Sequence, residues 1–219
     1  MEPILVINPN SSEDVTAAID RSLDGLRTSL AIDVQCRTLA EGPPGIESQA
    51  DVESVVQPTA QLIASEPAGA YVIACFSDPG LFLARELTPR PVLGIAESAF
   101  HLAIGLGGRF GIVAILKGSI PRHVRHVRAL GYEDSLAGDR ALGIGVAGLK
   151  DRAAVIDQLI AVGTALRDDD GADVVILGCA GMGQYRAELE QHLGVPVIDP
   201  CLAAVARAAG LIALGYRLA

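Results

Sequence analysis

The sequence predicts an α/β fold made of two similar flavodoxin-like halves, each a short parallel sheet flanked by helices. Short apolar runs alternate along the chain with longer segments of helical spacing, which is typical of parallel sheets covered by helices on both faces. Segments of the first half also recur in the second half at a nearly constant offset. Hydrophobic residues make up 50% of the 219 residues, which is enough for a sizeable core.

The predicted elements follow from the places where apolar runs meet turn residues. Strands are expected at residues 4–7, 32–36, 71–74, 92–95, 111–115, 142–146, 174–177 and 197–198. Helices are expected at residues 13–26, 52–64, shortly after Cys75, and at 98–106, 119–130, 151–167, 185–192 and 202–214. Residues 41–45 must form a loop, because two prolines and two glycines suit neither a strand nor a helix.

The internal repeat is clearest around two cysteines. Cys75 ends the run YVIAC, and Cys179 ends the similar run VILGC 104 residues later. In both places a helical segment follows, and then a strand that begins with Pro-Val, at Pro91 and at Pro196. Duplicated α/β halves usually pack about a pseudo-two-fold axis. We therefore expect the two cysteines to face each other across the crevice between the halves.

The same repeat predicts how the chain is divided. The opening strand at residues 4–7 recurs at residues 111–114. We expect the first half to comprise residues 1–97 together with a C-terminal helix at about residues 200–219, and the second half to comprise residues 98–199.

The composition and charge argue against nucleic-acid and membrane partners. The net charge of −9 and the pI of about 4.8 argue against a nucleic-acid partner, because phosphate binding needs clustered cations. No apolar run reaches the roughly 18 residues of a membrane span, and the N-terminus lacks a signal-peptide pattern. We therefore expect a cytoplasmic protein with no membrane partner, in which the four cysteines are reduced thiols.

Each repeated cysteine sits where a strand ends and a helix begins, the position at which open α/β sheets bind ligands. We expect Asp78 to cap the helix after Cys75, with Pro79 as its first residue. Two opposed thiols suit racemisation, since one thiolate removes a proton from a carbon and the other thiol returns one to the opposite face. The alternatives from the residues alone are two buried core cysteines or a disulfide.

Four motifs carry a resemblance that extends over essentially the whole chain: Asn8-Pro9-Asn10-Ser11, Cys75-Phe76-Ser77-Asp78-Pro79-Gly80, Gly178-Cys179-Ala180-Gly181-Met182 and Pro196-Val197-Ile198-Asp199. The sequence resembles the hydantoin racemase branch of the aspartate/glutamate racemase superfamily. The resemblance implies cofactor-independent racemisation of 5-substituted hydantoins, or of allantoin, with a homo-oligomeric enzyme as the expected form.

The resemblance also implies site residues. The catalytic pair would be Cys75 and Cys179, and the candidate substrate contacts would be Asn10, Ser77, Ala180, Gly181, Asn8, Ile46 and Ile115. One departure concerns the substrate, because Ala114-Ile115 stands where the family commonly carries a Thr pair. No Arg or Lys stands beside either cysteine in the sequence, so a neutral cyclic amide is favoured over aspartate or glutamate.

Other assignments remain open. A free amino-acid racemase, an arylmalonate-decarboxylase-like enzyme and a non-catalytic small-molecule-binding protein are the alternatives. Residues 143–148 match G-x-G-x-x-G, but the glycines fall inside a predicted strand, which disfavours a nucleotide site. The helix at residues 119–130 is expected to present a solvated or subunit-contact face, because it carries Arg122, His123, Arg125, His126 and Arg128 without a further metal ligand.

Overall fold

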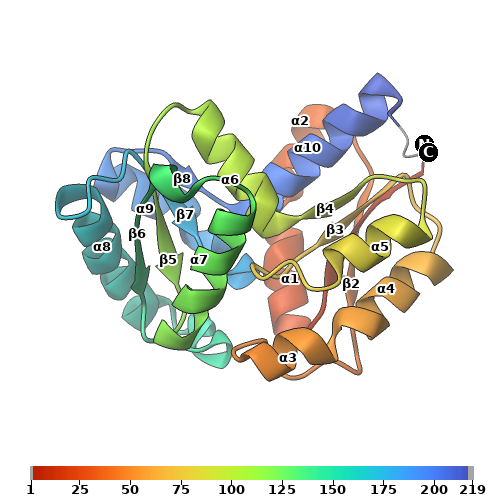
Figure 1. Cartoon of the computed structure of the whole chain (residues 1–219), viewed down its shortest axis with the longest axis horizontal. Helices are drawn as coiled ribbons and strands as arrows, with labels where there is room; N and C mark the ends of the chain where they lie inside the picture. The colour runs from red at the N-terminus through yellow and green to blue at the C-terminus, as the bar shows by residue number, and fades with distance from the viewer. Residues whose placement is uncertain (1, 217–219) are drawn as a thin grey trace.

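The computed structural model describes residues 2–216 and contains two parallel four-stranded sheets (Figure 1). The first has the strand order β2-β1-β3-β4 and the second the order β6-β5-β7-β8, so the two halves share one topology. The strands are β1 (Ile4–Asn8), β2 (Val34–Thr38), β3 (Ala70–Ile73), β4 (Val92–Gly94), β5 (Phe110–Ala114), β6 (Leu136–Ala141), β7 (Val174–Leu177) and β8 (Val197–Ile198). The prediction of an α/β fold with two similar halves is confirmed.

Ten α-helices flank these sheets in the described part of the chain. They are α1 (Glu13–Ser22), α2 (Asp24–Leu30), α3 (Gln49–Ser54), α4 (Val56–Ser65), α5 (Leu81–Leu87), α6 (Ile95–Gly105), α7 (Ile120–Ala129), α8 (Arg152–Asp168), α9 (Arg186–Leu193) and α10 (Pro200–Leu214). Four 3-10 segments lie between them: η1 (Lys117–Ser119), η2 (Glu133–Ser135), η3 (Val146–Lys150) and η4 (Ala180–Tyr185). No described helix combines the length and the apolar character that a bilayer crossing requires.

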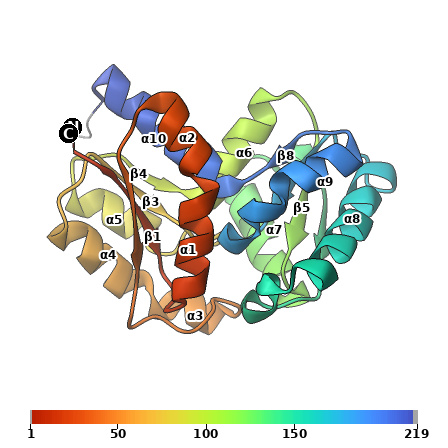
Figure 2. The same cartoon turned by 180° about the vertical axis from the view of Figure 1, so that it is seen from behind.

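The core runs continuously from one sheet to the other. Helix α6 contacts β4 of the first sheet and β5, β7 and β8 of the second, and α10 packs on α6 and on β3 (Figures 1 and 2). Val72, Phe100 and Ile112 are fully buried in one apolar cluster that includes residues of both sheets. Burying such side chains contributes roughly 1.5–3 kcal/mol each, so the packing of α6 fixes the position of the two halves relative to each other.

The placement of α10 bears on the predicted division of the chain. This helix follows the last strand of the second sheet, yet it contacts β1, β3 and β4 of the first (Figure 2). The division into residues 1–97 with about 200–219, and 98–199, stays a prediction, and residues 217–219 lie outside the described residues.

Several predicted boundaries are wrong. The strand expected at residues 142–146 lies earlier, as β6, and Gly143 with φ of +81° takes the chain out of strand geometry. The G-x-G-x-x-G segment therefore lies in the loop after a strand and in η3, not inside the strand. The helices expected at residues 13–26 and 52–64 are each divided in two, at Leu23 and Val55, whose side chains are fully buried.

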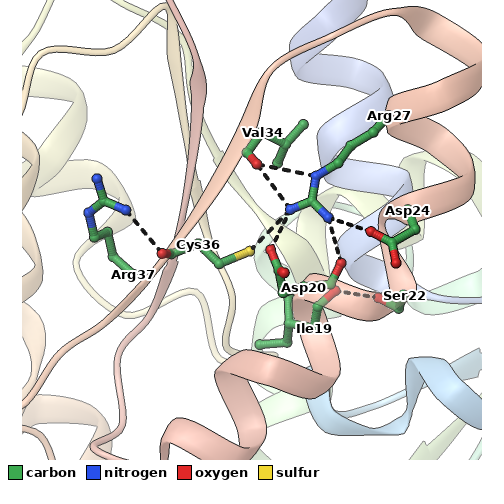
Figure 3. Close-up of polar contacts among 8 residues, drawn as sticks. All are labelled: Ile19, Asp20, Ser22, Asp24, Arg27, Val34, Cys36 and Arg37. Atoms are coloured by element: carbon green, nitrogen blue, oxygen red, sulfur yellow. Dashed lines mark hydrogen bonds and ion pairs between the residues drawn. The ribbon is translucent and has the colours of Figure 1, made fainter.

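Arg27 holds α2 against the edge strand β2 (Figure 3). Its guanidinium donates to the carbonyl oxygens of Asp20 (2.7 Å) and Val34 (3.0 Å), contacts the Asp20 carboxylate, and lies 4.0 Å from the Cys36 sulfur. Burial, followed by the hydrogen bond with Asp20, raises the pKa of Cys36 to about 12. Cys36 is therefore a structural thiol with little thiolate character at neutral pH.

Candidate active site

Cys75 and Cys179 line one pocket between the two halves. Cys75 comes two residues after β3 and Cys179 two residues after β7, and these strands hold equivalent positions in their sheets. We call this space the inner pocket. Its lining includes seven of the predicted site residues, namely Asn10, Ile46, Cys75, Ser77, Ile115, Cys179 and Ala180, together with Val15, Ala74, Phe76, Ser119, Arg122, His123, Val146 and Gly178. Its free volume is only about 40 Å³.

The two thiols are alike in their burial and in the backbone donor that each one meets. Each side chain is half-buried and free of any disulfide. Burial raises the pKa of Cys75 to about 12, while a hydrogen bond from the backbone N–H of Ser77 favours the thiolate. Burial likewise raises the pKa of Cys179 to about 11, with the backbone N–H of Gly181 in the matching role. The internal repeat thus extends to the donor two residues after each cysteine.

A larger cleft of about 590 Å³ adjoins the inner pocket, and we call it the outer cleft. Val15 and Val146 line both spaces and so form the wall between them. Gly181 lines the outer cleft rather than the inner pocket, but a Cβ at this position would lie 3.9 Å from the Cys179 sulfur. The predicted contact Gly181 therefore marks the boundary between the two spaces.

The two predicted asparagines differ in position. The Asn8 amide donates to Asn10 Oδ1 (3.0 Å), the Ser12 carbonyl (3.2 Å) and Thr16 Oγ1 (3.0 Å), and Asn8 does not line the inner pocket. Its role is to build the turn after β1. Asn10 does line the pocket, and its Oδ1 accepts the Ser12 N–H (2.9 Å). No acceptor for the Asn10 Nδ2 group occurs within residues 2–216.

Asp78 does not cap the helix after Cys75, so that prediction is wrong. Helix α5 begins at Leu81 with Gly80 as its N-cap, and Asp78 has φ of +44°. The buried carboxylate instead accepts the backbone N–H groups of Ala96 and Glu97, each at 2.9 Å, at the start of α6. Asp78 therefore ties the cysteine loop to the helix that bridges the two sheets.

The cationic helix α7 is also placed differently from the prediction. His123 is 3% exposed, and its Nδ1 lies 2.9 Å from Oδ2 of the buried Asp139. Arg122 is half-buried and lines the inner pocket beside Cys75, where its positive charge offsets a small part of the rise that burial causes in the Cys75 pKa. These residues do not form a purely solvated face. One signal could have found them: α7 follows β5, so its first turn lies at the same sheet edge as the cysteines.

Within the described residues, no three His, Cys, Asp or Glu side chains gather closely enough to hold a metal ion. The inner pocket offers two thiols with their two backbone donors, the Asn10 amide, the hydroxyl groups of Ser77 and Ser119, and the Arg122 guanidinium. This set can move protons and hold a polar ring.

Comparisons with known proteins agree with this geometry. The profile of the Asp/Glu/Hydantoin racemase family matches residues 4–208. A hydantoin racemase of Paenarthrobacter aurescens is 37% identical over 98% of this chain and 92% of its own length. The structure of an allantoin racemase from Klebsiella pneumoniae has a TM-score of 0.88 and 31% identity, covering 100% of this chain and 91% of that one.

A second allantoin racemase structure, from Pseudomonas fluorescens, has a TM-score of 0.92 and 26% identity, covering 99% of this chain and 93% of that one. Together these matches confirm the resemblance and the prediction of an isomerase of the racemase type. The chain belongs to the Asp/Glu/Hydantoin racemase family.

Proposed function

We propose that this protein is a cofactor-independent racemase of a cyclic amide, most specifically a 5-substituted hydantoin or the related allantoin. The observation that carries the proposal is the pair of thiols that follow equivalent strands and line one pocket. The substrate classes come from the relatives, which are described as hydantoin racemase and allantoin racemase.

The proposed reaction needs only proton transfers. One cysteine thiolate removes the proton from C5 and becomes a thiol, and the electron pair passes into an enolate on the adjoining carbonyl. The opposite thiol then gives its proton to the other face of C5 and becomes a thiolate. The enzyme finishes with its two protonation states exchanged, which prepares it for the opposite enantiomer. Positioned acid–base groups of this kind contribute about 10²–10⁴-fold to the rate.

The polar groups of the inner pocket suit a neutral ring. The Asn10 amide and the Ser77 hydroxyl can bond ring carbonyl and N–H groups. The five-membered ring would occupy the inner pocket, beside the two thiols. The C5 substituent would then extend past Val15 and Val146 into the outer cleft.

Solvent deuterium exchange tests the proposal directly. Wild-type protein incubated in D₂O with one enantiomer of a 5-benzylhydantoin should lose optical activity and gain deuterium at C5. Aspartate, glutamate and an arylmalonate serve as comparison substrates for the alternative activities. Exchange or decarboxylation of those compounds alone would contradict the proposal, and no reaction with any of them would favour a binding protein.

The proposed mechanism also predicts the pH dependence. Because the pKa values of Cys75 and Cys179 are raised to about 12 and about 11, the thiolate fraction grows about tenfold per pH unit below them. The value of kcat/KM should therefore rise steadily from about pH 7 to about pH 10, since it reports the ionisations of the free enzyme. Iodoacetamide labelling of the two thiols should follow the same profile. A plateau near neutral pH would contradict this expectation.

A further inference from the structure

Arg122 brings a positive charge to a pocket in which the sequence predicts none. It lies in the first turn of α7 and lines the inner pocket together with Cys75 and Ile115. Its guanidinium is half-buried, and burial lowers its pKa from the ordinary value. Partly burying a charged side chain against an apolar wall costs free energy. Arg122 is therefore expected to take part in the chemistry of the site.

Three of the five N–H groups of this guanidinium have acceptors within the protein. Nη1 donates to the Gly118 carbonyl at 2.9 Å. Nη2 donates to the Glu47 carbonyl at 3.1 Å and to Ser119 Oγ at 3.2 Å. The Nε–H group is buried and has no acceptor within the described residues. A buried donor left without a partner costs about 1–3 kcal/mol, a cost that an incoming acceptor would relieve.

Among the residues that line the inner pocket, Arg122 is the one arginine or lysine. Ala114, the last residue of β5, and Ile115, which follows it, are apolar and buried. Ser119 Oγ accepts from Arg122 Nη2, and its own hydroxyl hydrogen is a second, uncharged donor at this wall. Resting on the function proposed above, we infer that Arg122 Nε donates to the ring carbonyl oxygen next to C5, and stabilises the enolate that forms on it.

The bonding pattern favours a single oxygen over a carboxylate. A carboxylate is gripped by two parallel N–H groups of arginine, and the Nη2 hydrogens that would complete such a fork are bound to Glu47 and Ser119. On this edge of the guanidinium the Nε–H alone is without an acceptor, and it matches one carbonyl oxygen. A donor placed before the reaction also needs no reorganisation when the negative charge develops.

The neighbouring His123 keeps this wall in place. Its imidazole is buried, bonds Asp139 of β6, and packs edge-on against Phe76 with ring centroids 5.0 Å apart. This packing connects α7 to the loop that carries Cys75. Arg122 therefore approaches the substrate from a rigid surface, as a hydrogen-bond donor to an oxyanion must.

Two replacements separate the donor from the charge. Arg122→Met removes both, and Arg122→Lys keeps a positive charge but has no N–H at the Nε position. Both variants should lose about 10²–10³-fold in kcat for deuterium exchange into a 5-benzylhydantoin, with KM changed only a few-fold. Arg125→Met is the matched control, because Arg125 lies on the same helix and bonds the exposed Gln49. It should keep the wild-type rate and melting temperature.

A substrate change tests the contact in a way that does not depend on the stability of a variant. A hydantoin with sulfur in place of the carbonyl oxygen next to C5 offers a weaker acceptor to Arg122. The oxygen-to-sulfur ratio of kcat should be at least about tenfold larger for the wild type than for Arg122→Met, as one lost hydrogen bond to charge implies.

Three results would overturn the inference. One is a wild-type rate in Arg122→Lys, which would assign the effect to charge alone. Another is an oxygen-to-sulfur ratio that is the same in wild type and Arg122→Met. The third is a rate loss that only follows a lowered melting temperature. Absence of any exchange by the wild-type protein would instead overturn the proposed function, and this inference with it.

Discussion

Replacement of either Cys75 or Cys179 by serine should reduce racemisation of a 5-substituted hydantoin by about 10²–10⁴-fold. A serine hydroxyl keeps the position of the thiol, but it is a far weaker acid and cannot supply the base. Because the two sulfurs act in sequence on one proton transfer chain, the double variant should be no worse than the poorer single variant. Chiral chromatography of the product with time measures the loss.

Deuterium exchange distinguishes the two thiols from each other. With Cys75→Ser, only the enantiomer whose C5 proton faces Cys179 should still exchange, and the reverse should hold for Cys179→Ser. Cys36→Ser is the matched control, since this thiol bonds in the Arg27 network and does not line the inner pocket. Equal exchange of both enantiomers by either single variant would contradict a two-base mechanism.

The repeat explains why the cysteine pair could be found from sequence. Cys75 and Cys179 follow strands whose buried apolar runs are local signals, and the equal offset shows that these strands occupy equivalent places. Parallel strands direct their carboxyl ends to one edge of each sheet, and the packing of the two sheets through α6 brings those edges together. Seven of the predicted residues line the inner pocket for the same reason.

The α7 wall could not be found in the same way. Which face of a helix is buried depends on how the helix packs. Taken alone, the charged residues from Arg122 to Arg128 are typical of a solvent-exposed surface. His123 is paired with Asp139 in the interior. Asp139 lies on β6, a strand that the sequence predicts several residues too late. With β6 misplaced, the contact between His123 and Asp139 could not be predicted either.

Asp78 shows a similar limit. Its sequence context, directly before Pro79, is a local signal for a helix start, and Asp78 does stabilise a helix start. The helix is α6, which begins at Ile95, and no local pattern specifies a contact across that distance. A cap between residues this far apart in the sequence can be recognised only from the tertiary structure.

Asp78→Ala should lower the free energy of unfolding by roughly 2–4 kcal/mol at neutral pH, because two buried N–H groups of α6 lose their acceptor. The loss should depend on pH. Burial raises the pKa of Asp78 to about 7, with the Glu97 carboxylate adding to the rise, and the ordinary value is 3.8. The folded state thus binds a proton that the unfolded state has lost, which favours folding at about pH 5 and fades as the pH rises through 7. The variant should therefore be more strongly destabilised at pH 5 than at pH 8, as measured by urea unfolding.

Gly94 provides an independent check on the same contact. A Cβ at this position would lie 2.1 Å from Asp78 Cγ, so Gly94→Ala should cost about 1–3 kcal/mol or more in the free energy of unfolding. In the Asp78→Ala background the carboxyl group is gone, and the added methyl group should cost much less. Such a double-mutant cycle yields a coupling energy between the two positions. Gly25→Ala, at a helical glycine with no atom within 4 Å of its added Cβ, should be neutral or stabilising in both backgrounds. Additive losses for Gly94→Ala and Asp78→Ala would show that the added methyl group does not meet this carboxyl group.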